Sequence, residues 1–462
     1  MFGERMRTDP VEQAARAEQI AGALRADGVR GVVLSYVDTA GITRIKTVPV
    51  ARLARAARWG VGMSPVFDVF LSNDLITSTA QLGGPDGDLR LVPDLDRLVA
   101  LAAQPGWAWA PVDRYTQAGD VWGACQRGFA RAMVDRAAAT GLSFEMAIEV
   151  EWALGRGDSA DFVPACTGPA YGMTRLVELS DYARDVLAAL DAQGIEVDQL
   201  HPEYSDGQFE VSVAAKDPVG AADDSVLVRQ TIRAVSQRHG LRASFAPAVL
   251  AGHVGNGGHV HLSAWRDGRN VFSGGAGPHA LTAEGEAAAA GILELLPALL
   301  AIGAPSVASY LRLVPSHWAG AFACWGHETR ETALRLVTGT AGTESSAANL
   351  EVKCVDLAAN PYLLLGALVA ASLHGLQRHR RLPPPVTGDP ARCTADELVA
   401  QGIRRLPTTL DEATEAFAAA EPLRAALGNM LTDAVLAVRR AEADRLRDAP
   451  PDDVAADLRW RY

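Results

Sequence analysis

The chain has no excess of positive charge and few cysteines. Its 462 residues carry 43 lysines and arginines against 55 aspartates and glutamates, which gives a formal net charge of −12. Because such a chain is repelled by nucleic acid and by anionic lipid, neither is an expected partner. The five cysteines are odd in number, widely spaced and without a CxxC pair. They indicate reduced thiols and not a disulfide framework or a zinc knuckle.

Secretory features and unbroken apolar runs are also missing. The N-terminal stretch MFGERMRTDPVEQAARAEQ is polar and has no apolar centre, so its composition is not that of a secretory signal. The longest apolar stretch, LLPALLAIGAPSVASYL, is broken by Pro297 and Pro305, which favours a kinked pair of buried helices over a membrane span. These absences predict a cytoplasmic protein that contacts no membrane.

The length and the 48% hydrophobic content are enough for a large core and two or three domains. Residues 11–27 have the pattern of an amphipathic helix, and residues 31–50 have that of a strand, a turn and a second strand. We predict an α+β fold with a small N-terminal domain over residues 1–110. A larger domain over 111–462 would alternate strands with helices such as 360–378.

Two pairs of glutamates have spacings that concentrate negative charge. In IEVEW, Glu149 and Glu151 are two residues apart on a predicted strand, so their side chains point to the same side. Their neighbours are apolar, and two buried carboxylates side by side are costly unless cations compensate them. In HPEYSDGQFE, a hairpin would bring Glu203 and Glu210 toward one point. Each pair is either part of a metal site or a solvated acidic surface.

Three histidines lie within HVGNGGHVH, residues 253–261. His259 and His261 share one face of the strand that follows, and the glycines before them, Gly255 among them, let the backbone approach a ligand closely. A glutamate-rich site joined by one or two histidines suits Mg²⁺ or Mn²⁺ better than zinc. His253 is interpreted as a loop residue.

Basic residues follow in two later segments. YLRLVPSHWAGAFACWGHETRETALRLV carries Arg312, Arg330 and Arg335, and NLEVKCVDLAANPYLLL carries Glu351 and Lys353 on one strand face. Arginines beside a polycarboxylate metal site indicate recognition of phosphate and carboxylate groups. A single arginine of this kind can equally serve an ordinary ion pair on a helix face.

Taken in order, five segments resemble the glutamine synthetase family: EVE, the E-x6-E stretch containing GQFE, GxGxHVHxS, RLVP…ETR…ALR and LEVK…ANPYL. The match covers most of residues 113–380, and the N-terminal domain is similar to the family's small β-grasp domain. The resemblance implies a catalytic domain with a curved antiparallel sheet flanked by helices. It also implies a homo-oligomer, commonly a dodecamer of two hexameric rings, with each active site between one subunit's sheet and a neighbour's N-terminal domain.

In this family ATP phosphorylates the side-chain carboxylate of glutamate, and an amine then attacks the γ-glutamyl phosphate. A carboxylate is a poor electrophile, phosphate is a good leaving group, and divalent cations neutralise the phosphates. The resemblance therefore implies ATP as cosubstrate and two or more Mg²⁺ or Mn²⁺ ions per site. The implied ligands are Glu151, Glu203 and Glu210 for one ion, and Glu149, His259 and Glu351 for the other.

The substrate positions carry over in the same way. His261 and Ser263 match positions on the nucleotide side. Gly255 would lie at the amino group of glutamate and Arg312 would pair with its α-carboxylate, which makes glutamate the expected acid substrate.

The resemblance also implies which residues handle the reacting charges. Arg330 and Arg335 would stabilise charge on the transferring phosphoryl group. Lys353 stands where the family usually has arginine, so it keeps the charge but loses the bidentate fork. Glu203 would remain as an acid beside the amine.

The amine pocket departs from the family pattern. In ammonia-using members the loop after RLVP is Gly-Tyr-Glu, and its glutamate closes the site and helps to deprotonate the nitrogen. Here the loop is Ser-His-Trp, with Trp318 in place of the glutamate. The family's ammonium-binding aspartate is also missing from GVGMSPVFDVF, where Asp68 is the nearest acid. Tyr171 would match a tyrosine of the family's ammonium site.

Selective binding of ammonium requires convergent carboxylates and removal of a proton. Two lost acids and a gained indole, which can contact an alkyl chain or a cation, favour an amine that carries carbon. These departures resemble the γ-glutamylpolyamine and γ-glutamylethanolamide synthetases. We predict an ATP-dependent ligase that joins the γ-carboxylate of glutamate to an organic amine such as ethanolamine, a polyamine or another alkylamine. The alternatives are a true glutamine synthetase using ammonia, in which Trp318 only repacks the loop, and a catalytically silent relative.

Overall fold

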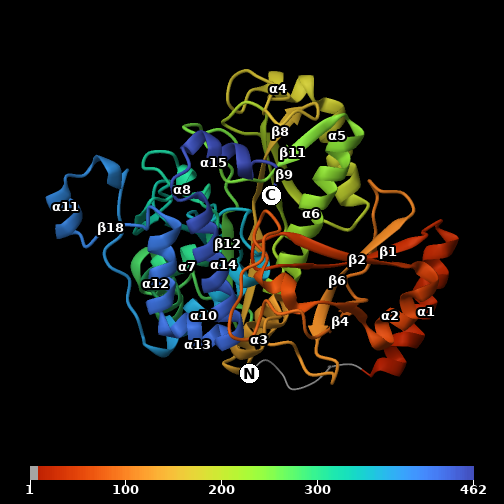
Figure 1. Ribbon diagram of the computed structural model, residues 1–462. Helices are drawn as coiled ribbons and strands as arrows, with labels where there is room; N and C mark the ends of the chain where they lie inside the picture. The colour runs from red at the N-terminus through yellow and green to blue at the C-terminus, as the bar shows by residue number, and fades with distance from the viewer. Residues whose placement is uncertain (1–8) are drawn as a thin grey trace.

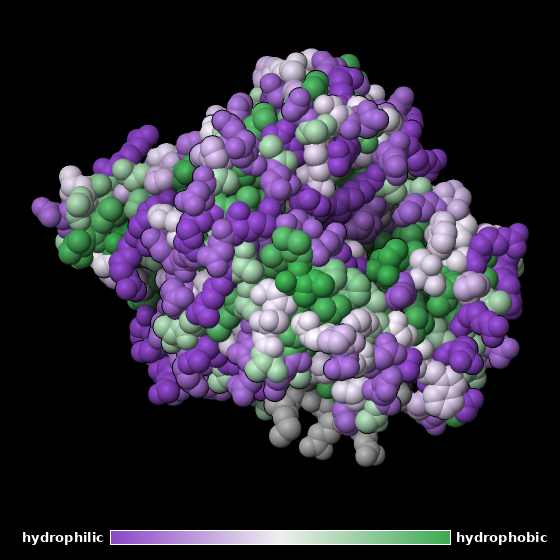
Figure 2. All heavy atoms as spheres, in the orientation of Figure 1, coloured by the Kyte–Doolittle hydropathy of each residue, from purple (hydrophilic) through white to green (hydrophobic). Residues whose placement is uncertain are grey.

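The structure is a computed structural model that describes residues 9–462, so the first eight residues of the polar N-terminal segment lie outside it. Figure 1 shows the N-terminal elements gathered on one side and the rest of the chain forming a larger body. Both parts contain helices and strands, which confirms the predicted α+β class. The face seen in Figure 2 is mostly hydrophilic, with a compact apolar group near its centre.

The N-terminal part is a mixed sheet in the order β2-β1-β6-β4-β3, with β5 beside β6 and two helices packed on it. Its elements are α1 (Pro10–Ala26), β1 (Gly31–Val37), β2 (Thr43–Pro49), α2 (Leu53–Trp59), β3 (Val61–Met63), β4 (Leu89–Pro93), β5 (Val99–Ala100) and β6 (Trp107–Tyr115). α1 begins where the Asp9 carboxylate accepts a hydrogen bond from the Val11 N–H, with Pro10 in the first turn. The boundary predicted at residue 110 falls inside β6, which is parallel to β1 and antiparallel to β4.

The larger part contains two principal sheets. One has the order β11-β8-β10-β9, and the other has the order β13-β12-β17-β16-β15 with β7 paired to β12. Their strands are β7 (Leu142–Ile148), β8 (Val150–Arg156), β9 (Val197–Pro202), β10 (Gln208–Val213), β11 (Leu241–Ser244), β12 (Val260–Arg266), β13 (Arg269–Asn270), β15 (Trp325–His327), β16 (Leu334–Val337) and β17 (Asn349–Val352). β15 and β16 run parallel, and the other pairs in these sheets are antiparallel. A short pair, β14 (Phe322–Ala323) with β18 (Arg404–Arg405), stands apart.

Glu149 marks the crossing from one sheet to the other. The sequence predicts one strand through LSFEMAIEVEWAL, but the structure breaks it at Glu149 into β7 and β8, which pair with strands of different sheets. The Glu149 N–H instead donates a hydrogen bond to the His259 carbonyl at 2.9 Å. Alternation of side chains could not reveal this break, because it depends on which partner strands the two halves find.

Helices cover the sheets and fill the C-terminal part. They are α3 (Gln126–Ala139), α4 (Met173–Glu178), α5 (Ser180–Asp191), α6 (Pro218–Arg238), α7 (Ala283–Gly303), α8 (Ser309–Arg312), α9 (Glu344–Ala347), α10 (Pro361–Gln377), α11 (Ala395–Ala400), α12 (Leu410–Ala419), α13 (Glu421–Leu427), α14 (Asn429–Leu446) and α15 (Pro451–Leu458). Among residues 9–462 one helix, α7, is long and apolar enough to cross a membrane by composition, but 83% of its apolar window is buried inside the fold. α7 contains Pro297 and ends before Pro305, so it is the core helix that the broken apolar run predicts.

A buried ion cluster joins the two parts of the chain. The Arg127 guanidinium on α3 lies 2.7 Å from Asp94, 2.9 Å from Asp113 and 2.9 Å from Asp223. Asp94 and Asp113 belong to the N-terminal part, and Asp223 lies on α6. Because a buried guanidinium needs several acceptors, this cation ties the N-terminal sheet to the larger body.

Candidate active site

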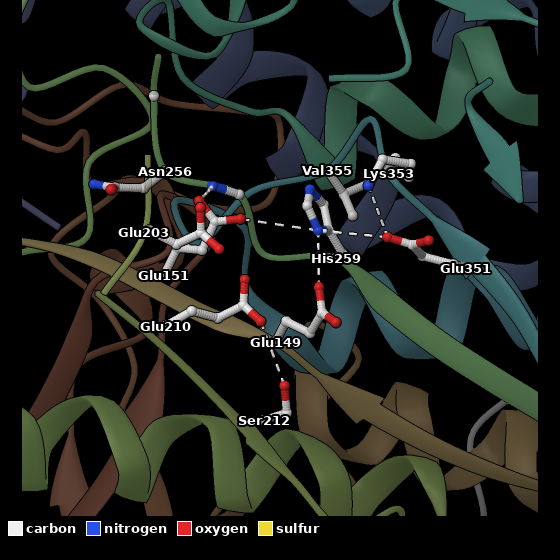
Figure 3. A network of polar contacts seen from close by, with 12 residues as sticks. Glu149, Glu151, Glu203, Glu210, Ser212, Asn256, His259, Glu351, Lys353 and Val355 are labelled. Carbon is white, nitrogen blue, oxygen red and sulfur yellow. Dashed lines mark hydrogen bonds and ion pairs between the residues drawn. The ribbon is translucent and has the colours of Figure 1, made fainter. Parts of the chain in front are cut away.

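Three predicted ligands come together where β7, β8, β12 and β17 meet. Glu149 stands at the strand break, His259 precedes β12, and Glu351 lies on β17. His259 Nδ1 is 2.8 Å from Glu149 Oε2 and 3.6 Å from Glu351 Oε1 (Figure 3). One potential ligand atom from each residue lies within 4.8 Å of the other two. Segments far apart in the sequence therefore supply one compact set of oxygen and nitrogen donors.

A second set of donors lies on the hairpin of β9 and β10. It consists of His201, Glu203 and Glu210, with potential ligand atoms again within 4.8 Å of one another. The strand register places Glu210 opposite His201, and His201 Nε2 lies 3.5 Å from Glu210 Oε1. The sequence reasoning missed His201, although it stands two residues before Glu203 and alternation along β9 could have indicated it.

Glu151 lies between these two sets. It faces Glu210 in the register of β8 with β10, and its Oε1 is 3.9 Å from His259 Nδ1. Its other oxygen accepts hydrogen bonds from the Gly257 N–H at 2.8 Å and from Gln208 Nε2 at 3.0 Å. Figure 3 shows that the structure brings all six predicted metal ligands into one region. His201 lies with Glu203 and Glu210 in the second donor set.

The electrostatics of this region fit bound cations. Burial, together with the neighbouring carboxylates of Glu149, Glu151 and Glu203, raises the pKa of Glu210 to about 7 despite the His201 ring beside it. Such crowding of buried carboxylates is unfavourable without positive charge among them. Oxygen and imidazole donors without sulfur suit Mg²⁺ or Mn²⁺. The residues present therefore fit a pair of divalent cations.

Lys353 and Arg335 neutralise the far side of the cluster. Burial alone would raise the pKa of Glu351, but Lys353 and the two histidines lower it to about 2. Lys353 Nζ donates to Glu351 Oε1 at 2.8 Å, and Arg335 donates to Glu351 Oε2 at 3.1 Å and to Glu328 at 2.8 Å. Arg330 is exposed on the loop between β15 and β16 and makes no hydrogen bond or ion pair with another residue of the range 9–462.

His261 and Ser263 follow His259 along β12. His261 Nε2 is 3.0 Å from Glu149 Oε1, and its Nδ1 is 2.8 Å from the Asn349 side-chain oxygen. Although burial opposes protonation, Glu149 raises the pKa of His261 to about 9. The Ser263 hydroxyl accepts a hydrogen bond from Trp265 Nε1 at 2.8 Å.

Arg312 and the glycine segment close the other side of the region. Arg312 donates to the carbonyls of Lys353 and Val355 at 3.1 and 3.3 Å, and one of its nitrogens lies 2.9 Å from His259 Nε2. A Cβ at Gly255 would lie 2.0 Å from the Pro247 carbonyl oxygen and 3.1 Å from Arg312 Cβ. Glycine is required there because the Pro247 carbonyl and the aliphatic part of the Arg312 side chain leave no room for a side chain.

The predicted amine residues lie on exposed loops next to Glu203. Tyr171 donates to Glu203 Oε1 at 2.5 Å and stacks on His201 with 5.3 Å between ring centroids. Trp318 contacts Tyr204, which the sequence reasoning did not single out. Asp68 is fully buried and its carboxylate pairs with Arg114 at 2.6 Å, so it forms a structural ion pair in the protein interior.

Comparison with known proteins extends this description. Two family models match the chain: glutamine synthetase N-terminal domain over residues 17–121, and glutamine synthetase, catalytic domain, over residues 123–455. The gamma-glutamylpolyamine synthetase GlnA3 of Streptomyces coelicolor is 61% identical over 463 residues, covering 98% of this chain and 99% of that protein. The glutamate–methylamine ligase of Methyloversatilis universalis is 28% identical, covering 89% of this chain and 92% of that protein.

A solved structure agrees with these matches. A crystal structure described as a novel glutamine synthase homolog superposes with a TM-score of 0.84 at 33% identity, covering 94% of this chain and 99% of its own. The two family models together span most of the sequence, in the order in which the N-terminal sheet and the larger body occur. The chain therefore belongs to the glutamine synthetase family and is one of its ligases.

Proposed function

We propose that this protein joins the γ-carboxylate of glutamate to a polyamine at the expense of ATP. The γ-phosphoryl group of ATP would pass to a γ-carboxylate oxygen, which releases ADP and leaves γ-glutamyl phosphate. The amine nitrogen would then attack the carbonyl carbon, the carbon–oxygen bond to phosphate would break, and the amine would lose a proton. The single structural observation that favours an organic amine over ammonium is the indole of Trp318, which contacts the ring of Tyr204 beside Glu203.

The relatives support a polyamine as the amine. The relative that is 61% identical over nearly its whole length is named for gamma-glutamylpolyamine synthesis, and a more distant one is a methylamine ligase. Each name pairs an organic amine with glutamate or with a γ-glutamyl group. The choice of a polyamine over ethanolamine or another alkylamine rests on the higher identity of the first relative.

Each predicted site residue keeps a proposed role. Divalent cations would be held by the two donor sets and by Glu151, and would neutralise the phosphates when bound. Arg312 and Gly255 would hold glutamate, and His261 and Ser263 would face the nucleotide. Glu203, Tyr171 and Trp318 would lie at the amine. Arg330 and Arg335 would stabilise charge on the transferring phosphoryl group, and Lys353 would contact a substrate.

Arg330 differs from the other proposed residues. It is exposed and unpaired among residues 9–462, so its guanidinium is available to pair with a phosphate group. A cytoplasmic location, a dodecameric ring and the choice between Mg²⁺ and Mn²⁺ also stay predictions.

The test is ADP and phosphate release with glutamate and Mg²⁺ against a panel of amines, with mass detection of the γ-glutamyl product. The panel holds ammonium, methylamine, ethanolamine, putrescine and spermidine. We expect the highest kcat/KM for putrescine or spermidine. A preference for ammonium would identify a true glutamine synthetase, and no product with any amine would contradict the proposal.

A further inference from the structure

Two large aromatic rings contact each other at the surface beside the acid cluster. The ring centroids of Tyr204 and Trp318 are 4.8 Å apart with an interplanar angle of 48°. Tyr204 remains 47% exposed and Trp318 41% exposed, so neither ring is buried in the core. Tyr204 directly follows Glu203, whose side chain belongs to the hairpin donor set. The pair therefore borders the region where the amine is proposed to bind.

The turn that carries Tyr204 is held rigidly. Its N–H donates to Glu203 Oε2 at 2.9 Å. The buried guanidinium of Arg175 donates to the carbonyls of Glu203 at 2.8 Å, Ser205 at 2.6 Å and Tyr204 at 3.4 Å. A buried cation with several carbonyl acceptors fixes the backbone of this turn. The backbone atoms from which the Tyr204 side chain projects are therefore held in place.

The loop that carries Trp318 is held in an unfavourable conformation. Ser316 has φ +59° and Trp318 has φ +55°, a region that bulky residues rarely adopt. The Trp318 N–H donates to Glu331 Oε1 at 3.0 Å, and the Ser316 hydroxyl donates to Asp389 at 2.7 Å. Two carboxylates thus hold the loop in the shape that sets the indole against Tyr204. Local strain of this kind concentrates at functional sites.

The chemistry around the rings suits a chain with a second positive charge. Of the carboxylates near the rings, Glu203 directly precedes Tyr204, whereas Asp206 is paired with Arg175 at 3.1 Å and Glu331 accepts the hydrogen bond from the Trp318 N–H. Negative charge attracts an ammonium group, exposed aromatic faces bind it further, and the same rings pack on methylene groups. An uncharged alkyl chain would gain only the packing, and a carboxylate would be repelled.

We propose that Tyr204 and Trp318 form a clamp that holds the methylene chain and the distal ammonium of a diamine or polyamine while its other amine reacts. Glu331 is a positioning residue that acts through the Trp318 backbone. This inference rests on the proposed function and adds residues that would set which amine is used. Ammonium lacks the methylene chain and the second charge, so it would gain nothing from the clamp.

The test uses Tyr204→Leu, Trp318→Leu and the double variant in the full-length chain with Mg²⁺, ATP and glutamate. For putrescine or spermidine we expect KM to rise at least about tenfold in each single variant, with kcat at saturation nearly retained. KM for glutamate and for ATP should stay within about twofold, since the clamp touches neither. Tyr204→Phe and Trp318→Phe keep an aromatic face and should restore most of the affinity.

Two further variants complete the design. Trp59→Leu removes an exposed indole of the N-terminal part and should change no kinetic constant. Glu331→Gln keeps an acceptor for the Trp318 N–H and should bind polyamine nearly as wild type, whereas Glu331→Ala should raise the polyamine KM as Trp318→Leu does.

The outcomes separate the clamp from the proposed function. If the wild-type chain makes γ-glutamylpolyamine but the leucine variants keep its polyamine KM, the clamp is wrong and the function stands. An equal rise in KM for glutamate, ATP and polyamine would show general damage to the site and would also overturn the clamp. If the wild-type chain uses ammonium alone, both proposals fail.

Discussion

At Glu210, burial and the neighbouring carboxylates both disfavour the ionised form. Its carboxylate is enclosed among other acids, and its pKa is raised to about 7 because the ionised form is unfavourable there. The same crowding makes the position suitable for a cation, since a bound ion replaces repulsion with attraction. Glu210 therefore destabilises the protein when no cation is bound. Removing its charge should preserve or raise stability without metal but lower ligase activity.

Glu210→Gln should keep the shape of the side chain while removing one negative charge. We expect the melting temperature without metal to be equal to or above that of wild type at pH 8. Ligase activity at limiting Mg²⁺ should fall by about 10- to 100-fold, because one charged donor is lost. Calorimetric melting with EDTA and with Mg²⁺, together with product formation, checks both expectations. A variant less stable than wild type in EDTA would contradict the account of crowded carboxylates.

Arg312 is a second residue at which identity matters beyond charge. Its fork reaches the carbonyls of Lys353 and Val355 and the ring of His259 together. Arg312→Lys retains one positive charge but cannot occupy all three positions, and leaving buried carbonyls unpaired costs about 1–3 kcal/mol.

For Arg312→Lys we therefore expect KM for glutamate to rise at least about tenfold, with a smaller change in KM for ATP. Initial rates with each substrate varied in turn provide the measurement. Equal changes in both constants would show that Arg312 supports the whole site and does not hold glutamate in particular.

At the scale of elements, the hairpin of β9 and β10 does the positioning. Its register sets Glu210 opposite His201, and its other neighbour, β8, sets Glu210 opposite Glu151. Gly207 makes the turn with φ +73°, and a Cβ there would lie 2.6 Å from the Leu154 carbonyl oxygen. The turn is thus packed against β8, so a change at this glycine acts directly on the placement of the donors.

Gly207→Ala should destabilise the protein by about 2–4 kcal/mol, from the left-handed backbone and the close contact together. Gly194→Ala is the matched control, because Gly194 has φ +72° but a Cβ there would meet nothing within 4 Å. The control should lose about 1 kcal/mol and keep its stabilisation by Mg²⁺. Denaturant unfolding with and without Mg²⁺ measures both. Equal losses in the two variants would show that contact with β8 is unimportant.

At the scale of the whole molecule, buried charge joins the N-terminal sheet to the larger body. Arg127 contacts Asp94, Asp113 and Asp223, and Asn360 at the start of α10 donates to the Val37 and Asp38 carbonyls. These contacts connect segments far apart in the sequence. Their loss should therefore affect the association of the two parts more than either part alone.

Arg127→Leu should lower the free energy of unfolding by about 3–5 kcal/mol, because it leaves buried carboxylates without their cation. Arg440→Leu, at an exposed pair with Glu415, should change it by less than about 1 kcal/mol. Denaturant unfolding followed by tryptophan fluorescence provides the comparison, and an unfolding transition that splits in two would show that the parts separate. An Arg127→Leu protein as stable as the control would contradict the role of this cluster.

The sequence alone determined the family, the α+β class, and the two-residue spacing of Glu149 with Glu151 and of His259 with His261. The backbone repeat of a strand predicts a shared face for each pair, and the structure brings these residues together although Glu149 lies at a strand break and His259 precedes β12. The hairpin turn before Glu210 and the helix start at Asn360 are similarly local, since each depends on a few residues and their backbone angles.

Only the tertiary structure decided how these faces meet. It broke the predicted strand at Glu149, added His201 to the donors, buried Asp68 against Arg114, left Arg330 exposed and set Tyr204 against Trp318. Each outcome depends on pairing and packing between distant segments. Spacing along the chain sets the direction of a side chain, but the partner it reaches is chosen by the free energy of the whole fold.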